Sequence, residues 1–190
     1  MMHVIFTGER VRLRPFIDAQ ELTGLIEELD LQEHYFWAPE WWPKGRIEKL
    51  FEKYGMLDSV LHFSYFAIER LDTGELIGTE VAEIPSPGVI QSEIGTVILK
   101  RHWCQGFGRE AKQLAMCFVF ENFPVETVTA GTLSTHSRAI AGLEAVGMSY
   151  VGKHHGRPLS NGRYASVVHY AITRHEWEQH SIRRTAVRGV

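Results

Sequence analysis

The chain has 190 residues, of which 44% are hydrophobic and 23% are charged, and its formal net charge is −3 at pH 7. These values are typical of one globular domain and argue against a disordered chain. The small negative charge gives no indication of nucleic acid or an anionic membrane as a partner. We therefore expect a single domain over residues 1–190, with a frayed tail from about residue 184.

Cysteine usage and apolar runs bear on the compartment. Cys104 and Cys117 lack the spacing of a metal site and are expected to be reduced thiols. No apolar run is long enough to cross a bilayer, and the opening residues lack the basic start and cleavage site of a signal peptide. The sequence therefore predicts a cytoplasmic protein. The ten histidines show neither HxH nor HExxH spacing, so no metal site is expected.

The first 62 residues predict one strand and two helices. Residues 11–16 alternate between apolar and polar side chains, which indicates a strand. Asp18 is suited to cap a helix, with Glu21 as the partner residue of a capping box. Residues 33–43 are rich in aromatic side chains and are interrupted by two prolines, so no regular element is expected there. Residues 46–56 return to helical spacing.

Three strands joined by tight turns follow. Residues 63–70 and 75–84 flank an Asp-Thr-Gly turn and predict a hairpin. A second turn over residues 85–88 leads to a third strand over residues 89–99. The end of that strand has apolar residues in a row, which is typical of burial on both faces.

Helices and strands alternate over the rest of the chain. The predicted elements are a helix over 111–123, a strand over 125–133, a helix over 138–146 that ends at Gly147, two antiparallel strands over 149–155 and 164–173, and a helix over 175–183. The order β-αα-βββ-α-β-α-ββ indicates an α/β fold. We expect one mixed, mostly antiparallel, seven-stranded sheet with helices on both faces.

The junction over residues 102–111 is the most informative stretch, because Gly106 and Gly108 stand where a helix is predicted to begin. The start of a helix presents several backbone N–H groups, and the helix dipole favours an anion there. Glycine also lets a ligand approach the backbone closely. The alternative is a glycine-tightened connection with no ligand, and these residues alone do not separate the two.

Four short motifs occur in a fixed order within residues 7–178. They are residues 8–15 in the first strand, residues 94–98 with 103–111 across the glycine junction, residues 143–148 at the end of a helix, and residues 170–177 at the end of the last strand. Together with the order of elements, they resemble the GNAT N-acetyltransferase superfamily, and within it the Rim-type subgroup of ribosomal-protein N-terminal acetyltransferases. A GNAT-like fold is what this resemblance implies.

The chain also departs from the pattern of that superfamily. Trp103 takes the first position of the loop motif, as it often does in the subgroup, but Cys104 stands where the subgroup usually has glycine, so a stiffer loop is expected. The superfamily's Asn-x-x-Ser falls on His136 and Ala139, and that asparagine often helps to hold the pantetheine arm. A tyrosine that serves as general acid in many members falls on Leu143.

The resemblance implies acetyl-CoA as co-substrate and no metal. Backbone N–H groups from Gln105 to Arg109 would bind the pyrophosphate, and the pantetheine arm would pair with the strand edge at residues 96–98. Arg109 would add a charge-assisted contact, unless it is a solvated residue of the first helical turn. The implied cofactor-binding residues are Thr96, Val97, Ile98, Trp103, Gln105, Gly106, Phe107, Gly108, Arg109 and His136.

The implied reaction is transfer of the acetyl group by direct attack of an amine on the thioester. A lysine amine with its usual pKa of about 10.4 is almost all protonated at neutral pH, whereas an α-amine has a pKa near about 8, so a general base is useful. Glu93 is the candidate base, with Glu80 and Glu83 as alternatives; otherwise Glu93 is a solvent-facing strand residue. Ser134 is the candidate acid for the CoA thiolate, with His136 or solvent as alternatives.

The aromatic segment over residues 33–43 is the candidate acceptor site, since this connection forms a wall of the acceptor groove in the resembling family. Tyr35, Trp37, Trp41 and Trp42 are the candidate substrate-binding residues, because aromatic faces hold apolar groups and cations. The alternative is a hydrophobic plug at the end of the sheet. The acceptor is either a protein N-terminus or a small-molecule amine, and a homodimer is expected from the family. Two other functions stay open: a CoA-binding or interaction module that has lost catalysis, and transfer of a larger acyl group.

Overall fold

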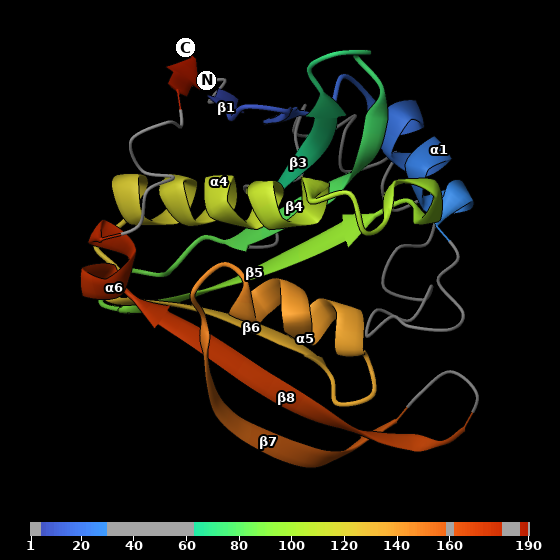
Figure 1. Cartoon of the computed structure of the whole chain (residues 1–190). Helices are drawn as coiled ribbons and strands as arrows, with labels where there is room; N and C mark the ends of the chain where they lie inside the picture. Colours follow the sequence, from blue (N-terminus) through green and yellow to red (C-terminus); the bar gives the residue numbers. More distant parts are fainter. Residues whose placement is uncertain (1–4, 30–62, 159–161, 180–186, 190) are drawn as a thin grey trace.

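A computed structural model of the chain describes residues 5–29, 63–158, 162–179 and 187–189. Its centre is a nine-stranded sheet in the order β7-β8-β6-β5-β4-β3-β2-β1-β9 (Figure 1). The strands are β1 Ile5–Thr7, β2 Val11–Pro15, β3 Phe63–Arg70, β4 Leu76–Glu83, β5 Gln91–Ile98, β6 Thr127–Leu133, β7 Ser149–Pro158, β8 Tyr164–Thr173 and β9 Val187–Gly189. The helices are α1 Ala19–Glu28, the 3-10 helix η2 Lys100–His102, α4 Phe107–Asn122, α5 Ser137–Glu144 and α6 Arg174–Glu178.

The expected mixed, mostly antiparallel sheet is confirmed. Neighbouring strands are antiparallel except β5 and β6, which are parallel. The strands β3 and β8 have the predicted bounds, and the other five predicted strands agree to within three residues at each end. The helix α4 begins at Phe107, earlier than predicted, because Gly106 already serves as its N-cap.

The sheet has two strands more than the seven expected. β1 pairs with both β2 and β9, so that Phe6 lies opposite Leu13 on one side and Arg188 on the other. The expectation of a frayed tail is therefore wrong for residues 187–189. Each of these strands has three residues, which is too short for an alternating pattern to be detected in the sequence.

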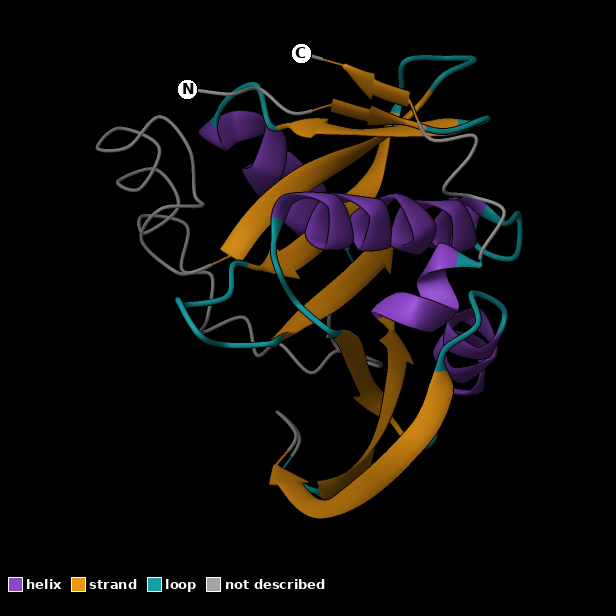
Figure 2. Cartoon of the chain, turned by 90° about the vertical axis from the view of Figure 1, so that its left-hand side faces the viewer, coloured by secondary structure: helices purple, strands orange, loops and turns teal. Residues whose placement is uncertain are grey.

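Helices cover both faces of the sheet, as expected (Figure 2). On one face, α4 contributes most of its residues to the larger core, which α5 and α6 share. Trp177 of α6 stacks on Phe120 of α4 with 4.9 Å between ring centroids. On the opposite face, Leu22 and Leu25 of α1 pack in a smaller core with Tyr65 of β3. The site described below lies beside α4, on the face of the larger core.

Local signals fix the ends of two helices. Asp18 accepts a hydrogen bond from Glu21 N at 2.8 Å and caps α1 as predicted, while the Glu21 carboxylate reaches back to Ile17 N, also at 2.8 Å. After α5, Gly147 has φ +86° and its N–H donates to Glu144 O at 3.0 Å. A left-handed glycine that closes a helix in this way was the role expected of Gly147.

Some expectations lie outside the described residues. These are the aromatic segment over 33–43, the helix over 46–56, and the part of the terminal helix beyond α6. Within the described ranges, no helix has the length and apolar character needed to span a membrane.

Candidate active site

The parallel strands β5 and β6 separate along their length. Their ladder covers three pairs and ends at Glu93 opposite Thr129. Beyond it, β5 continues to Ile98 paired with β4, and β6 continues to Leu133 paired with β8. The edge of β5 over residues 94–98 therefore borders an opening within the sheet, which Figure 1 shows as the divergence of the two strands.

The open edge presents the backbone groups of alternate residues. Thr127 N donates to Ile90 O across the ladder, so the even-numbered residues of β5 direct their N–H and C=O groups toward β6. The backbone N–H and C=O groups of Ile94, Thr96 and Ile98 consequently face the opening. One acceptor is already in use, because the Trp103 indole N–H donates to Ile98 O at 2.6 Å. The remaining groups form an edge to which an extended ligand can add.

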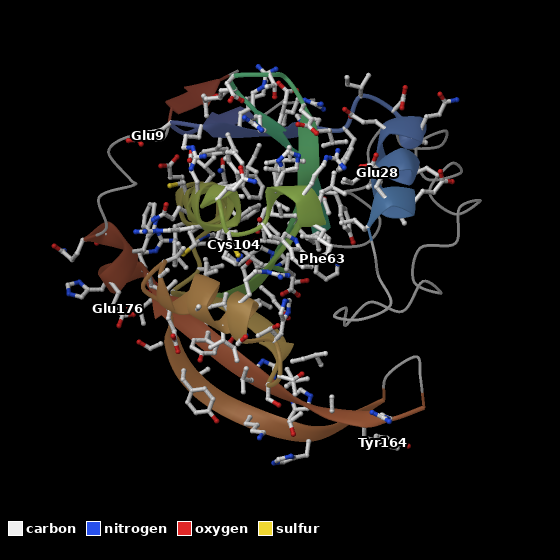
Figure 3. All side chains as sticks on the ribbon, turned by 45° about the vertical axis from the view of Figure 1, so that its right-hand side comes forward. Glu9, Glu28, Phe63, Cys104, Tyr164 and Glu176 are labelled. Carbon is white, nitrogen blue, oxygen red and sulfur yellow. The ribbon has the colours of Figure 1, made fainter. Side chains whose placement is uncertain are left out.

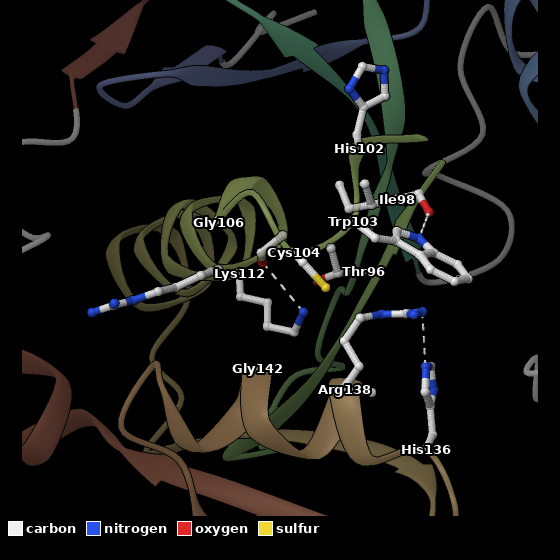
Figure 4. A pocket seen from close by; sticks show the side chains of 13 residues that line it. Thr96, Ile98, His102, Trp103, Cys104, Gly106, Lys112, His136, Arg138 and Gly142 are labelled. Carbon is white, nitrogen blue, oxygen red and sulfur yellow. Dashed lines mark hydrogen bonds between the residues drawn. The ribbon is translucent and has the colours of Figure 1, made fainter. Parts of the chain in front are cut away.

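A cavity of about 200 Å³ lies beside this opening, between the N-terminal ends of α4 and α5 (Figure 4). Its described lining residues are Thr96, Ile98, His102, Trp103, Cys104, Gly106, Gly108, Arg109, Lys112, His136, Arg138, Ala139 and Gly142. Three of them are Lys or Arg, two are His, and none is acidic. Positive side chains beside two helix N-termini favour an anionic ligand.

The loop before α4 is held by Arg10, which lies in the turn between β1 and β2. Gly106 adopts φ +87° and serves as the N-cap of α4. Arg10 Nη1 donates to Gln105 O at 2.6 Å, and the Arg10 guanidinium lies 4.3 Å from the centroid of the Phe107 ring. Phe107 is itself buried. Arg10 thus holds the loop, while Gly106 and Gly108 line the cavity.

Cys104 has φ +58°, and it is the one residue other than glycine with positive φ in the described part of the chain. It is exposed, carries a free thiol and lines the cavity next to α4 (Figure 3). A side chain in the left-handed region costs about 1–2 kcal/mol. The stiffer loop expected from cysteine in place of glycine therefore takes the form of a strained backbone position.

Trp103 connects β5 to α5 across the mouth of the cavity. The Arg138 guanidinium lies 3.2 Å from the centroid of the Trp103 ring, while the indole N–H holds Ile98 O. Arg138 Nη2 also donates to His136 Nε2 at 3.2 Å. These contacts, drawn in Figure 4, fix the Arg138 cation and the His136 ring at the start of α5.

A buried ionisable pair lies beside the same cavity. Glu80 of β4 is fully buried, and neither carboxyl oxygen has a hydrogen-bond partner among the described residues. Burial raises the pKa of Glu80 to about 8, against the opposing effect of Lys112. Burial likewise lowers the pKa of Lys112, against the opposing effect of Glu80. Thr96 lies opposite Glu80 in the ladder, and its buried hydroxyl, like Lys112, opposes the effect of burial on the pKa of Glu80.

The structure brings together seven of the ten implied cofactor-binding residues. The seven that line the cavity are Thr96, Ile98, Trp103, Gly106, Gly108, Arg109 and His136. The other three side chains point elsewhere. Val97 packs against the smaller core, Phe107 is buried beneath the loop, and Gln105 Nε2 donates to Arg101 O at 3.0 Å.

The structure does not bring the two candidate catalytic residues together. Glu93 is exposed at the end of the β5–β6 ladder, and its odd position places its side chain on the face of Val97, opposite α4. Ser134 lies just after β6, where its N–H donates to Ser166 O at 2.8 Å. Five residues of strand, or about 16 Å, separate it from Thr129, which pairs with Glu93. Neither candidate lines the cavity.

The candidate substrate-binding residues Tyr35, Trp37, Trp41 and Trp42 lie outside the described residues. No group of three or more His, Cys, Asp or Glu side chains that could hold a metal ion occurs in the described ranges.

Two cationic residues that line the cavity, Lys112 and Arg138, are not among the site residues predicted from the sequence. Lys112 has a detectable signal, because it follows Gly108 by four residues and so shares its helix face. Arg138 has none, since its contact with Trp103 joins residues that no local pattern relates.

A family model described as an acetyltransferase (GNAT) domain matches residues 10–149. Similar solved structures include a candidate acetyltransferase from T. thermophilus, with 25% identity and a TM-score of 0.72 over 95% of this chain and 93% of that one. Spermidine N-acetyltransferase from Vibrio cholerae in complex with CoA and spermine has 19% identity and a TM-score of 0.76 over 89% of this chain and 98% of that one. A GNAT-family acetyltransferase from Bacillus anthracis has 18% identity and a TM-score of 0.70 over 90% and 99%. No curated protein sequence matches this chain.

Proposed function

The chain belongs to the GNAT acetyltransferase family and is an N-acetyltransferase of that type, and we propose that it moves the acetyl group of acetyl-CoA to a primary amine. One observation carries the proposal. The open edge of β5 meets the N-terminal end of α4 in a single cavity. A strand edge suits a peptide-like arm, and a helix N-terminus suits a diphosphate, so both parts of CoA have a matching surface.

The diphosphate of CoA would bind at the N-terminal end of α4. The first N–H groups of a helix have no partner within the helix. Gly108 lines the cavity there, so the backbone is accessible. Arg109 and Arg138 line the same end and would add charge-assisted contacts to phosphate oxygens.

The pantetheine arm would pair with the edge of β5. Thr96 offers both backbone groups to the opening, whereas the carbonyl of Ile98 is held by Trp103. Val97 directs its backbone groups toward β4, opposite Thr79, so its part would be limited to maintaining the strand. An N–H group of this edge is also a suitable donor to the oxyanion that forms when the amine attacks the thioester.

The acceptor amine would approach from the face opposite α4. Glu93 stands on that face, at the point where β5 and β6 part. Its carboxylate would take the proton that the amine must lose, which is a small task for an α-amine and a larger one for a lysine-like amine. Ser134 does not line the cavity, so we also consider a group of the cavity itself for protonation of the leaving sulfur.

The acceptor class remains a choice between a protein N-terminus and a small amine. Resemblance to the Rim-type subgroup supports the first. The similarity in fold to a spermidine N-acetyltransferase solved with spermine supports the second. The aromatic residues Tyr35, Trp37, Trp41 and Trp42 are proposed to contact the acceptor. We also propose a cytoplasmic location, in keeping with two free cysteines, and a homodimer.

Loss of catalysis is the second candidate function. Leu143 is buried in the core at the position of the family's general-acid tyrosine, and His136 and Ala139 replace its Asn-x-x-Ser. A protein with these departures would bind CoA without transferring its acyl group. A donor larger than acetyl is a further alternative.

Release of free thiol from acetyl-CoA, measured over a panel of amines, tests the proposal. The panel contains ribosomal-protein N-terminal peptides, spermidine, spermine and free amino acids. Thiol release that depends on one amine class supports acetyl transfer and identifies the acceptor. The same assay is repeated with propionyl-CoA and succinyl-CoA as donors. Saturable CoA binding without amine-dependent release of thiol from any of these donors would favour the module that has lost catalysis.

A further inference from the structure

The pair formed by Glu80 and Lys112 has no role in the function proposed so far. Two apolar side chains of similar volume would avoid the desolvation cost that a buried ionisable pair carries. Glu80 is fully buried with both carboxyl oxygens lacking a described partner, and Lys112 lines the cavity (Figure 4). Ionisable groups held in this way beside a cavity are typical of functional sites.

The Lys112 ammonium lies where α4, α5 and β5 meet. Its Nζ donates to Gly108 O at 3.4 Å and lies 3.9 Å from the position that a Cβ would take on Gly142 of α5. A Cβ on Gly108 would lie 3.9 Å from both Lys112 Nζ and Thr96 Cγ2. An arm that runs from the start of α4 to the opening between β5 and β6 therefore passes this ammonium.

We propose that Lys112 is the catalytic residue that gives a proton to the sulfur leaving the thioester, and that Glu80 is a positioning residue that acts on Lys112 through the charge of its carboxyl group and not through a direct hydrogen bond. The inference rests on the proposed acetyl transfer and assigns the role of general acid to a residue that lines the cavity, which Ser134 does not. The fold supplies the arrangement, because β4 brings Glu80 beside Thr96 on the sheet face that α4 covers.

The acceptor nitrogen forms a bond to the acetyl carbonyl carbon, and the C–S bond then breaks with its electron pair on sulfur. The proton on Lys112 Nζ moves to sulfur and gives the free thiol. The proton lost from the acceptor nitrogen goes to Glu93 or water, and Lys112 regains a proton from solvent through the cavity.

The pKa of Lys112 depends on its burial and on the charged and titratable groups around it. They are Glu80 from β4, His102 and Cys104 before α4, Arg109 on α4, and His136 and Arg138 at the start of α5. Burial is the largest influence and lowers the pKa of Lys112, Arg138 lowers it further, and Glu80 opposes both. An ammonium with a lowered pKa gives its proton to a thiolate more readily than an ordinary lysine does.

Titration of the thiol of bound CoA tests the proposal without knowledge of the acceptor. The thiolate absorbs in the ultraviolet, and the complex with desulfo-CoA supplies the blank that removes the protein's own cysteines. We expect the bound thiol to ionise about one pH unit lower or more in the unmodified protein than in Lys112→Met, a tenfold change or greater, because a nearby cation stabilises the thiolate. Lys153→Met, an exposed lysine on β7, is the matched control and should titrate like the unmodified protein.

Glu80→Gln tests the positioning role with the same readout. It keeps the shape of the side chain, and we expect its bound thiol to titrate between the unmodified protein and Lys112→Met. Equal thiol titration in the unmodified protein and Lys112→Met, with both folded by thermal melting, would overturn the inference and leave acetyl transfer standing. Absence of saturable CoA binding by the unmodified protein would overturn both.

Discussion

The guanidinium of Arg138 lies 3.2 Å from the centroid of the Trp103 ring, and the same indole donates its N–H to Ile98 O at 2.6 Å. One side chain thus links the end of β5 to the start of α5. Residues of both elements line the cavity. Trp103 consequently connects two sides of the cavity.

Trp103→Phe keeps an aromatic ring beneath Arg138 but removes the indole N–H. We expect the free energy of unfolding to fall by about 1 kcal/mol, the usual net value of one hydrogen bond. Trp103→Leu removes the cation–π contact as well and should cost about 0.5–2 kcal/mol more. Urea unfolding measures both changes. Equal stability of Trp103→Phe and the unmodified protein would show that the bond to Ile98 contributes nothing.

Cys104→Gly should stabilise the protein. The position has φ +58°, which glycine adopts without steric cost, although glycine also loses more chain entropy on folding. The net gain in the free energy of unfolding should be about 0.5–1 kcal/mol. Cys104→Ala is the control, because it removes the thiol and keeps the strain. A gain in Cys104→Ala as large as in Cys104→Gly would assign the effect to the thiol instead of the backbone.

Gly78→Ala should destabilise the protein strongly. A Cβ on Gly78 would lie 2.1 Å from Val97 O of the neighbouring strand, so β4 and β5 would have to move apart. We expect a loss of about 1–3 kcal/mol in the free energy of unfolding, the usual cost of overpacking. Gly95→Ala on β5 is the matched control, since its Cβ would meet no atom within 4 Å. Similar losses in both variants would mean that a small shift of β4 removes the close contact at Gly78 with little loss of stability.

Glu80→Gln should change how stability depends on pH. Burial raises the pKa of Glu80 to about 8 in the folded protein, against about 4.3 in an unfolded chain. Between these two pH values the folded state holds a proton that the unfolded state has lost, so stability falls as pH rises. The unmodified protein should therefore lose stability relative to Glu80→Gln from about pH 5 to about pH 8. Urea unfolding at several pH values checks this, and a constant difference across the range would contradict it.

The fold was largely predictable from local signals. Asp18 caps α1 and Gly147 ends α5, as their residue types indicate. Gly74, with φ +70°, lies in the turn that joins β3 to β4. β1 and β9 were not predictable, because a strand of three residues is too short to show an alternating pattern of apolar and polar side chains. The pairing of Phe6 with Arg188 also depends on contacts between distant parts of the chain.

The site was predictable as a stretch of backbone but not side chain by side chain. The glycine motif locates the loop, yet it does not say that Phe107 turns inward beneath Arg10 while Arg109 lines the cavity. The influence of Glu80 on Lys112 escapes prediction because it joins strand β4 to helix α4, which no local pattern relates. The residues proposed to contact the acceptor lie in the aromatic segment over 33–43, where the family resemblance is least specific.

The most direct test of the central claim is a calorimetric titration of the unmodified protein with acetyl-CoA. The cavity at the junction of the β5 edge and the start of α4 predicts saturable binding of one acetyl-CoA per chain. Binding should weaken in Arg109→Ala and should be unchanged in Lys153→Met, which lies on β7 away from the cavity. Heats of dilution alone, with no saturation for either acetyl-CoA or CoA, would contradict the assignment of this cavity to the acetyl donor.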